Sequence, residues 1–370
     1  MSGQDAQELF EGLLGRCVAA GASDMHLSSG EPVSCRVHGR LRSFGDEQYS
    51  AGQIHAMVRA VLDERQQQEF AERMTVDLGY TSAAGERFRL NCYLELGSPA
   101  VAVRHLRQDM LSLEELGLPA KLRELARLRS GLVLVTGATG SGKSSTLAVL
   151  LDEINRNREC HILTVEDPVE FIHKNKLAVV HHREVHQDVP CYADAVRAAL
   201  REDPDVIMVG EMRDLETMQA SITAAETGHL VFSTLHTGEA VGAVERFIGA
   251  FSGKEQEAAR HRISMVLKAV IAQRLVVSAD GEGRLPALEL LMVNTAAANL
   301  IRTSNTAQLY SLMETGSKDG MWTLDQELAR LVRENRISRD AALEQSSHPA
   351  ALERLINANT AGGRRPGYGG

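Results

Sequence analysis

Short apolar runs separated by longer helical stretches fill the part of the chain that follows Gly131. Each run has four or five residues and is bounded by Gly, Asp or Pro, and the four runs are Leu132–Thr136, His161–Val165, Val206–Val209 and Leu230–Thr234. Runs of this length and composition are typical of strands that are buried on both faces of a sheet. The pattern therefore predicts a doubly wound α/β core with helices on both sides.

The residues before this core mix helical periods with alternating strand patterns. Phe88–Tyr93 and Val101–Leu106 are predicted to form two strands joined through Gly97, Ser98 and Pro99, within a small α+β domain. A charged helical segment containing Gly117 and Pro119 follows and is typical of a linker. We therefore predict a first domain over residues 1–112, and a linker, the α/β domain and C-terminal helices over residues 113–356.

Two further segments lie beyond the predicted strands. Lys254–Leu275 has the pattern of one long amphipathic helix. The glycine-rich residues 357–370 are expected to be a disordered tail.

A glycine-rich loop follows the first predicted strand and matches the pattern G-x-x-x-x-G-K-S. Its glycines allow backbone N–H groups to point at phosphates, at the positive end of the following helix. Lys143 supplies a charge for the β- and γ-phosphates, and the Ser144 hydroxyl is suited to Mg²⁺. The sequence therefore predicts that ATP and Mg²⁺ bind at Gly137, Ala138, Thr139, Gly140, Ser141, Gly142, Lys143, Ser144 and Ser145.

Carboxylates stand at the ends of two predicted strands. Glu166 follows His161–Val165, and Glu211 follows Val206–Val209. A lone acid in such a place usually caps a helix or faces solvent, but the carboxyl ends of parallel strands share one crevice with the glycine-rich loop. We therefore expect Glu211 to orient the attacking water and Glu166 to be a second catalytic group that organises metal and water. Asp205 precedes its strand and is predicted to form a turn.

Histidines and arginines offer further candidates. His229 and His236 stand at opposite ends of one predicted strand; most such histidines are structural, and His236 is the better candidate for sensing the γ-phosphate or a neighbouring subunit. His181 and His182 are expected to be surface residues without metal-ligand spacing, so no structural metal site is predicted. Arg87, Arg89 and Arg104 on the predicted hairpin form either a solvated face or a clamp on nucleotide phosphates.

The composition narrows the class of protein. A chain of 370 residues with 44% hydrophobic residues has enough apolar material for two cores. Its net charge of -9 argues against a protein that binds nucleic acid. Five isolated cysteines predict neither a disulfide framework nor a tetracysteine zinc site, which fits a reducing cytoplasm. Without an apolar run of membrane-spanning length, direct membrane insertion is not expected.

The motifs together resemble one family. The segments GLVLVTGATGSGKSSTLA, HILTVEDPVEFIH, REVHQD, ALREDPDVIMVGEMRDLET and TAAETGHLVFSTLHT are similar to the PilT/PilU retraction ATPases of type IV pili, within the type II/IV secretion ATPase superfamily. The resemblance implies a PAS-like first domain, a RecA-like ATPase domain and a homo-hexamer. It places Glu166 in the aspartate box, Glu211 in Walker B, His229 and His236 in the histidine box, and Arg87, Arg89 and Arg104 among nucleotide-facing arginines.

The same resemblance implies a cellular role. The ring would hydrolyse ATP at the cytoplasmic face of the inner membrane and withdraw pilin through a membrane platform protein, which drives twitching motility. Related extension ATPases carry a tetracysteine zinc site, so the lack of a C-x-x-C pair favours retraction over assembly.

Several positions depart from the family pattern. Ala138 and Ser145 replace a Pro and a Thr that phosphate contact does not require, and Gly97 replaces a common Arg. Ala298 and Thr303 stand where the family has Arg and Glu in a segment tied to retraction. An accessory, PilU-like subunit that co-assembles with a paralogous retraction ATPase therefore stays open as an alternative. A nucleic-acid translocating ATPase is disfavoured by the acidic composition.

Overall fold

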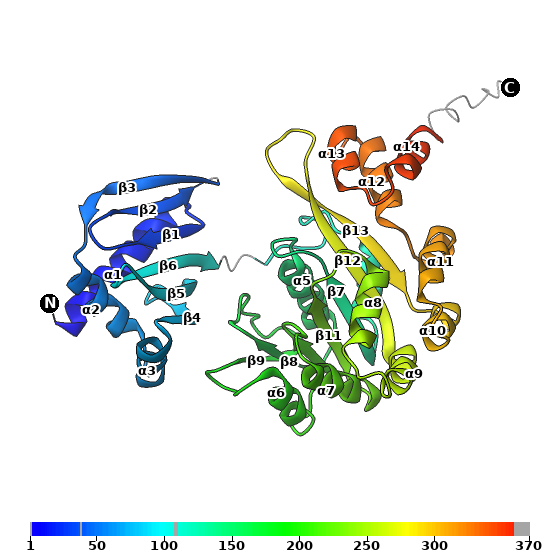
Figure 1. Ribbon diagram of the computed structural model, residues 1–370, viewed down its shortest axis with the longest axis horizontal. Helices are drawn as coiled ribbons and strands as arrows, with labels where there is room; N and C mark the ends of the chain where they lie inside the picture. Colours follow the sequence, from blue (N-terminus) through cyan, green and yellow to red (C-terminus); the bar gives the residue numbers. More distant parts are fainter. Residues whose placement is uncertain (1, 38, 107–109, 359–370) are drawn as a thin grey trace. The chain divides into compact units, whose positions relative to one another are not determined.

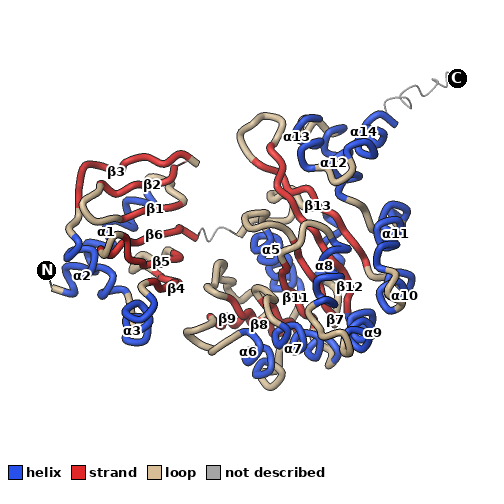
Figure 2. The backbone as a smooth tube through the Cα atoms, viewed as in Figure 1, coloured by secondary structure: helices blue, strands red, loops and turns tan. Residues whose placement is uncertain are grey.

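The computed structural model describes residues 2–37, 39–106 and 110–358, which divide into two compact units (Figures 1 and 2). The first unit comprises residues 1–109 together with the segment Asp167–Ile172, and the second comprises the remainder.

The first unit is built on an antiparallel sheet of six strands in the order β3-β2-β1-β6-β5-β4. The strands are β1 (Asp24–Leu27), β2 (Pro32–Val37), β3 (Arg40–Gln48), β4 (Thr75–Thr81), β5 (Arg87–Glu95) and β6 (Ser98–Leu106). The helices are α1 (Gly3–Ala19), α2 (Ala51–Val61) and α3 (Glu64–Arg73). Phe10 on α1 and Met57 on α2 share one buried core with Phe88 on β5, so α1 and α2 pack against the sheet. The predicted α+β character and hairpin are confirmed.

The second unit contains a sheet of seven strands in the order β13-β12-β7-β11-β10-β8-β9. All neighbouring strands are parallel except β12 and β13. The strands are β7 (Gly131–Thr136), β8 (His161–Glu166), β9 (Val179–Glu184), β10 (Val206–Val209), β11 (Leu230–Leu235), β12 (Leu267–Val277) and β13 (Arg284–Met292). The four predicted strands are therefore confirmed, and β9, β12 and β13 extend the sheet at its two sides.

Helices cover both faces of this sheet (Figure 1). Leu132 and Leu134 of β7 enter the core shared with the helices after β9, whereas Val133 and Val135 enter the core shared with α4 and α5. This alternation buries both faces of β7 and confirms the doubly wound α/β core. The helices are α4 (Arg123–Ala126), α5 (Lys143–Asn157), α6 (Tyr192–Ala199), α7 (Leu215–Glu226), α8 (Ala240–Gly249), α9 (Gln256–Val266), α10 (Thr295–Arg302) and α11 (Leu309–Thr315).

The single helix predicted over Lys254–Leu275 is wrong. Helix α9 ends at Val266, and β12 begins at Leu267. β12 runs parallel to β7 and antiparallel to β13, and nearly all of its residues from Leu267 to Ala272 are buried. These partner strands are distant in sequence, so the tertiary pairing overrides the local helical period.

Three helices close the second unit: α12 (Leu324–Arg333), α13 (Arg339–Gln345) and α14 (Pro349–Ala358). Leu328, Ala342 and Leu352 pack with Val276 of β12 and Ala287 of β13 in a small core of their own. Helix α14 continues through Ala358, so the expected tail does not begin at Asn357. Residues 359–370, the rest of the expected tail, lie outside the described residues.

No helix within the described ranges is both long enough and apolar enough to cross a membrane.

Candidate nucleotide site

The glycine-rich loop joins the end of β7 at Thr136 to the start of α5 at Lys143. A Cβ on Gly137 would lie 2.4 Å from the carbonyl oxygen of Gln273, and a Cβ on Gly142 would lie 2.8 Å from its Nε2. Both glycines also have positive φ angles, of 151° and 86°. Backbone geometry and the close approach of β12 therefore both require glycine here.

Two polar side chains of this loop, those of Ser141 and Lys143, are buried. Lys143 is buried, and its Nζ donates to the carbonyl oxygens of Gly137 and Ala138, each at 3.0 Å. The hydroxyl of Ser141 is buried without a hydrogen-bond partner among the described residues. A buried lysine, an unsatisfied hydroxyl and the first turn of a helix fit the phosphates of a nucleotide. Ser144, in that turn, is exposed and accessible to a metal that accompanies them.

Gln273 supports the glycine-rich loop, and its place in the sequence does not predict this contact. Its buried amide Nε2 donates to the carbonyl oxygen of Ser141 at 2.7 Å, and its Oε1 accepts from the hydroxyl of Thr146 at 2.6 Å. The side chain thus holds the loop and the first turns of α5 together. Its one sequence signal is a polar residue inside an apolar run, and the pattern of that run predicts a helix instead of a strand.

The strand order places several candidate residues along one edge of the sheet. β7, β11, β10 and β8 are parallel neighbours in that order. The glycine-rich loop, His236, Glu211 and Glu166 follow the carboxyl ends of these strands. Neighbouring strands lie about 4.8 Å apart. β10, which Glu211 follows, is therefore about 10 Å from β7, and β8, which ends at Glu166, is about 14 Å from β7. The structure therefore brings both carboxylates to the edge that carries the loop.

Glu211 is held between two cationic or polar side chains. Its Oε1 lies 2.6 Å from Nε of Arg213, and its Oε2 lies 3.3 Å from Nε2 of His236. A carboxylate accepts hydrogen bonds, so Nε2 of His236 is the donor. Asp214 has a different role, since its carboxylate caps α7 by accepting from the backbone N–H of Thr217 at 2.8 Å.

The surroundings of Glu166 contradict one prediction. His182 was expected on the surface, but its side chain is only 16% exposed and its Nδ1 lies 3.8 Å from Oε1 of Glu166. The reason is the pairing of β9 with β8, which sets His182 directly beside Thr164. His181 points the other way, is exposed as predicted, and forms a hydrogen bond of 3.0 Å with His161.

Two other residues lie at the opposite edge of the sheet. His229 precedes β11, and its Nδ1 forms a 2.9 Å hydrogen bond with the carbonyl oxygen of Ala224. The length of β11 therefore separates His229 from the glycine-rich loop. A role in sensing the γ-phosphate does not fit this position, and a role at a subunit interface stays a prediction. Asp205 accepts from the backbone N–H of His161 at 2.9 Å, in keeping with its predicted role in a turn.

The three arginines of the predicted clamp lie in the first unit. Arg89 and Arg104 are directly opposite each other on β5 and β6. Arg89 pairs with Asp77 at 2.5 Å, and Arg104 pairs with Asp24 at 2.9 Å. Arg87 donates to the hydroxyl of Thr81 at 3.2 Å. Aspartates therefore compensate two of these charges, and a role toward nucleotide stays a prediction for all three.

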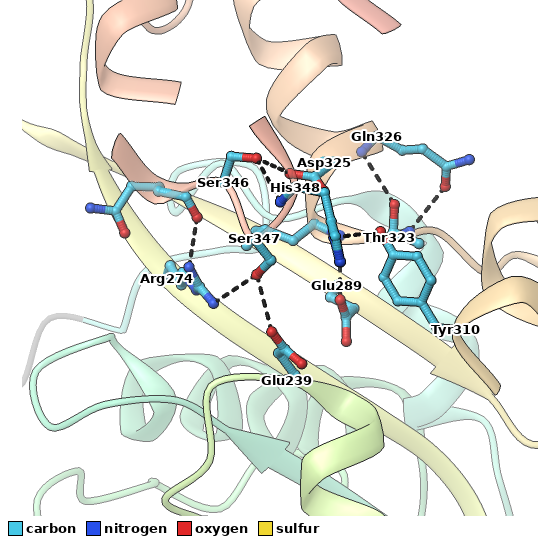
Figure 3. A network of polar contacts seen from close by, with 12 residues as sticks. Glu239, Arg274, Glu289, Tyr310, Thr323, Asp325, Gln326, Ser346, Ser347 and His348 are labelled. Atoms are coloured by element: carbon cyan, nitrogen blue, oxygen red, sulfur yellow. Dashed lines mark hydrogen bonds and ion pairs between the residues drawn. The ribbon is translucent and has the colours of Figure 1, made fainter. Parts of the chain in front are cut away.

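A polar network connects β12 with the C-terminal helices (Figure 3). Arg274 donates to the carbonyl oxygen of Gln345 at 2.6 Å and to Ser347, whose hydroxyl reaches Glu239 before α8. The buried carboxylate of Glu289 accepts from the backbone N–H groups of Ala240 and Leu324, at the starts of α8 and α12. Burial raises the pKa of Glu289 above its ordinary value. These contacts hold the starts of α8 and α12 and the end of α13 against β12 and β13.

The chain is similar to known proteins over almost its whole length. The family model described as type II/IV secretion system protein matches residues 4–354. The type IV pilus retraction ATPase PilT of Pseudomonas aeruginosa is 42% identical over 91% of this chain and 98% of its own length. The type IV pilus ATPase PilU of the same organism is 36% identical over 94% of this chain and 91% of its own.

One solved structure is similar to almost the whole chain. The crystal structure of the pilus retraction motor PilT with bound ADP has a TM-score of 0.86 and 41% identity, and it covers 93% of this chain and 98% of the PilT chain.

Proposed function

Because this chain belongs to the type II/IV secretion system protein family, we propose that it is an ATP-hydrolysing motor that powers the retraction of type IV pili. The observation that carries the proposal is the shared sheet edge, where Glu211 and Glu166 follow strands that are parallel to β7 and end at the same edge as the glycine-rich loop. The similarity to PilT over nearly the full length of both chains supports retraction as the work that hydrolysis drives.

Different residues at this edge have different roles in ATP hydrolysis. The backbone of the glycine-rich loop and Lys143 hold the phosphates. Ser144 and Glu166 would hold the accompanying Mg²⁺, which would supply positive charge to the phosphate oxygens. Glu211 orients the water that attacks the γ-phosphorus as the bond to the ADP oxygen breaks. Arg213 and His236 each contact one oxygen of the Glu211 carboxylate, and in this proposal His236 responds to loss of the γ-phosphate.

The motor works as a homo-hexamer in the cytoplasm, at the inner-membrane platform of the pilus. Arg87, Arg89 and Arg104 act on nucleotide phosphates in this assembly, either within one chain or from a neighbouring subunit. Domain movements that follow hydrolysis then withdraw pilin subunits, which produces twitching motility. The similarity to the retraction ATPase and to its paralogue PilU supports this assignment.

Steady-state phosphate release tests the hydrolytic part of the proposal. Glu211→Ala should retain ATP binding and lose turnover, with the oligomer size measured in the same preparation. Glu216→Ala is a matched control, since that carboxylate lies on α7 with its side chain 71% exposed. Unchanged turnover in Glu211→Ala would remove Glu211 from the catalytic role.

The second candidate function is an accessory, PilU-like subunit that joins a ring with another retraction ATPase. Ala298 and Thr303 on and after α10 favour it, because the retraction family has Arg and Glu there. Deleting the gene for this chain in its host separates the two. A primary motor leaves non-retracting pili when it is lost, whereas an accessory subunit leaves retraction that persists at reduced force. Negligible ATP hydrolysis by the purified ring would also favour the accessory function.

A further inference from the structure

His182 is one polar residue that lies close to the predicted catalytic carboxylate Glu166. In the parallel pairing of β8 with β9, His182 lies opposite Thr164, and Glu166 lies two positions further along β8, opposite Glu184. Side chains two positions apart on a strand point to the same face. Thr164, Glu166 and His182 therefore share one face of the sheet, on the edge that carries the glycine-rich loop.

The hydrogen bonds of His182 determine which ring nitrogen carries its proton. Nε2 lies 3.0 Å from the backbone nitrogen of His173 and accepts its N–H. A backbone N–H can only donate, so neutral His182 carries its proton on Nδ1. That Nδ1–H donates to the hydroxyl oxygen of Thr164 at 2.8 Å and lies 3.8 Å from Oε1 of Glu166. The Nδ1–H is therefore engaged by Thr164, and Nδ1 lies beyond hydrogen-bond distance of Oε1 of Glu166 but near enough to act on the carboxylate electrostatically.

A stacked ring and two hydrogen bonds hold the imidazole of His182 in this orientation. The ring of His173 stacks on it with centroids 5.8 Å apart and planes inclined by 15°. Burial lowers the pKa of His173 to about 4, so this neighbour is neutral at physiological pH. With a backbone donor at one nitrogen, a threonine at the other and a neutral ring on its face, His182 has one preferred placement.

We propose that His182 is a positioning residue that sets the direction of the Glu166 carboxylate in ATP hydrolysis. The inference rests on the role of Glu166 in the proposed function. The hydrogen bond to Thr164 holds the partial positive charge at Nδ1 3.8 Å from Oε1, and its attraction favours one orientation of the carboxylate. A catalytic group that is held in one productive orientation supports faster catalysis than one that rotates freely, because it spends less time in orientations that cannot react. His182 itself touches neither the glycine-rich loop nor Glu211 in any contact that the structure records.

Steady-state kinetics of the full-length chain test this role. His182→Phe keeps a ring that stacks on His173 but removes both nitrogens, and it should lower kcat about tenfold while leaving KM for ATP unchanged, because the phosphate-binding residues are untouched. His182→Gln supplies one acceptor and one donor at similar reach and should restore most of kcat. His181→Phe is the matched control, since that exposed neighbour contacts His161 instead, and it should hydrolyse ATP like the wild type.

A double-mutant cycle with Glu166→Gln separates failure of this inference from failure of the proposed function. If Glu166→Gln lowers kcat, His182→Phe should add little in that background, because His182 acts through Glu166. Wild-type kcat in His182→Phe alongside a slow Glu166→Gln overturns the positioning role alone. Wild-type kcat in Glu166→Gln overturns the catalytic role of Glu166 and this inference with it. Equal losses in His182→Gln and His182→Phe also overturn it.

A second variant guards against misfolding of His182→Phe. Thr164→Val removes the hydroxyl that holds Nδ1 while preserving the size of a buried side chain. It should lower kcat, by less than the histidine substitution, and leave KM unchanged. Full kcat in a folded Thr164→Val protein would contradict the proposed arrangement.

Discussion

Gln273 and Arg274, adjacent residues of β12, hold two different parts of the second unit. Gln273 donates to the carbonyl oxygen of Ser141 in the phosphate-binding loop, whereas Arg274 donates to the carbonyl oxygen of Gln345 at the end of α13. Successive side chains of a strand point to opposite faces. One strand therefore supports the candidate nucleotide site on one face and the C-terminal helices on the other.

This arrangement predicts separate effects for the two residues. Gln273→Leu should raise KM for ATP and destabilise the second unit by about 1 to 3 kcal/mol, because the Ser141 carbonyl and the Thr146 hydroxyl lose their buried partners. Arg274→Ala should lower thermal stability but leave KM unchanged. ATPase kinetics and thermal unfolding measure both, and equal changes in KM for the two variants would contradict the division.

Lys143→Ala should abolish most nucleotide binding. The substitution removes the buried charge that the phosphates require and leaves the carbonyl groups of Gly137 and Ala138 without this donor. We expect ATP affinity to fall by at least about tenfold, as measured by calorimetry. Lys254→Ala, at an exposed turn before α9, serves as the control. Wild-type affinity in Lys143→Ala would mean that ATP binds elsewhere.

The buried ring of His173 should make stability depend on pH. Its pKa is lowered from 6.5 in the unfolded chain to about 4 in the folded one, chiefly by burial, so the unfolded state binds the proton more readily between these values. Its contribution to stability is present above pH 6.5 and is lost as the pH falls toward 4.

The loss for this one residue should be about 1 kcal/mol at pH 5.5. Unfolding of the wild type and of His173→Gln at pH 7.5 and 5.5 measures it, since glutamine does not titrate. The variant should lose less stability than the wild type over this interval. Parallel losses in the two proteins would show that other groups govern the pH response.

Introducing the Arg and Glu that the family resemblance leads us to expect at positions 298 and 303 should affect retraction rather than hydrolysis. Ala298 lies on α10, and Thr303 caps its end by donating to the carbonyl oxygen of Asn299 at 2.8 Å. β13 runs antiparallel to β12, so α10 begins at the sheet edge opposite the phosphate-binding loop.

Ala298→Arg combined with Thr303→Glu should therefore leave phosphate release unchanged and increase pilus retraction driven by this chain alone. Microscopy of pilus retraction in a host without the paralogous ATPase measures the effect. Ala296→Arg, at an exposed position of the same helix, controls for added charge. Retraction equal to that of the unmodified chain would show that these two positions do not limit it.

The sequence by itself determined the features that depend on local composition. Four buried strands, the hairpin of β5 and β6, and the glycine-rich loop before α5 follow from apolar runs, turn residues and glycine spacing. The positions of Glu166 and Glu211 at strand ends also follow, because a parallel sheet aligns the carboxyl ends of its strands.

The tertiary structure alone decided which distant residues meet. β12 became a strand because β7 and β13 provide hydrogen-bonding partners on both sides, and this pairing brought Gln273 to the loop. His182 faces Glu166 because of the register between β8 and β9, and a shift of one residue would have directed His181 there instead. Strand order and register are set by packing across long sequence separations, which no local pattern encodes.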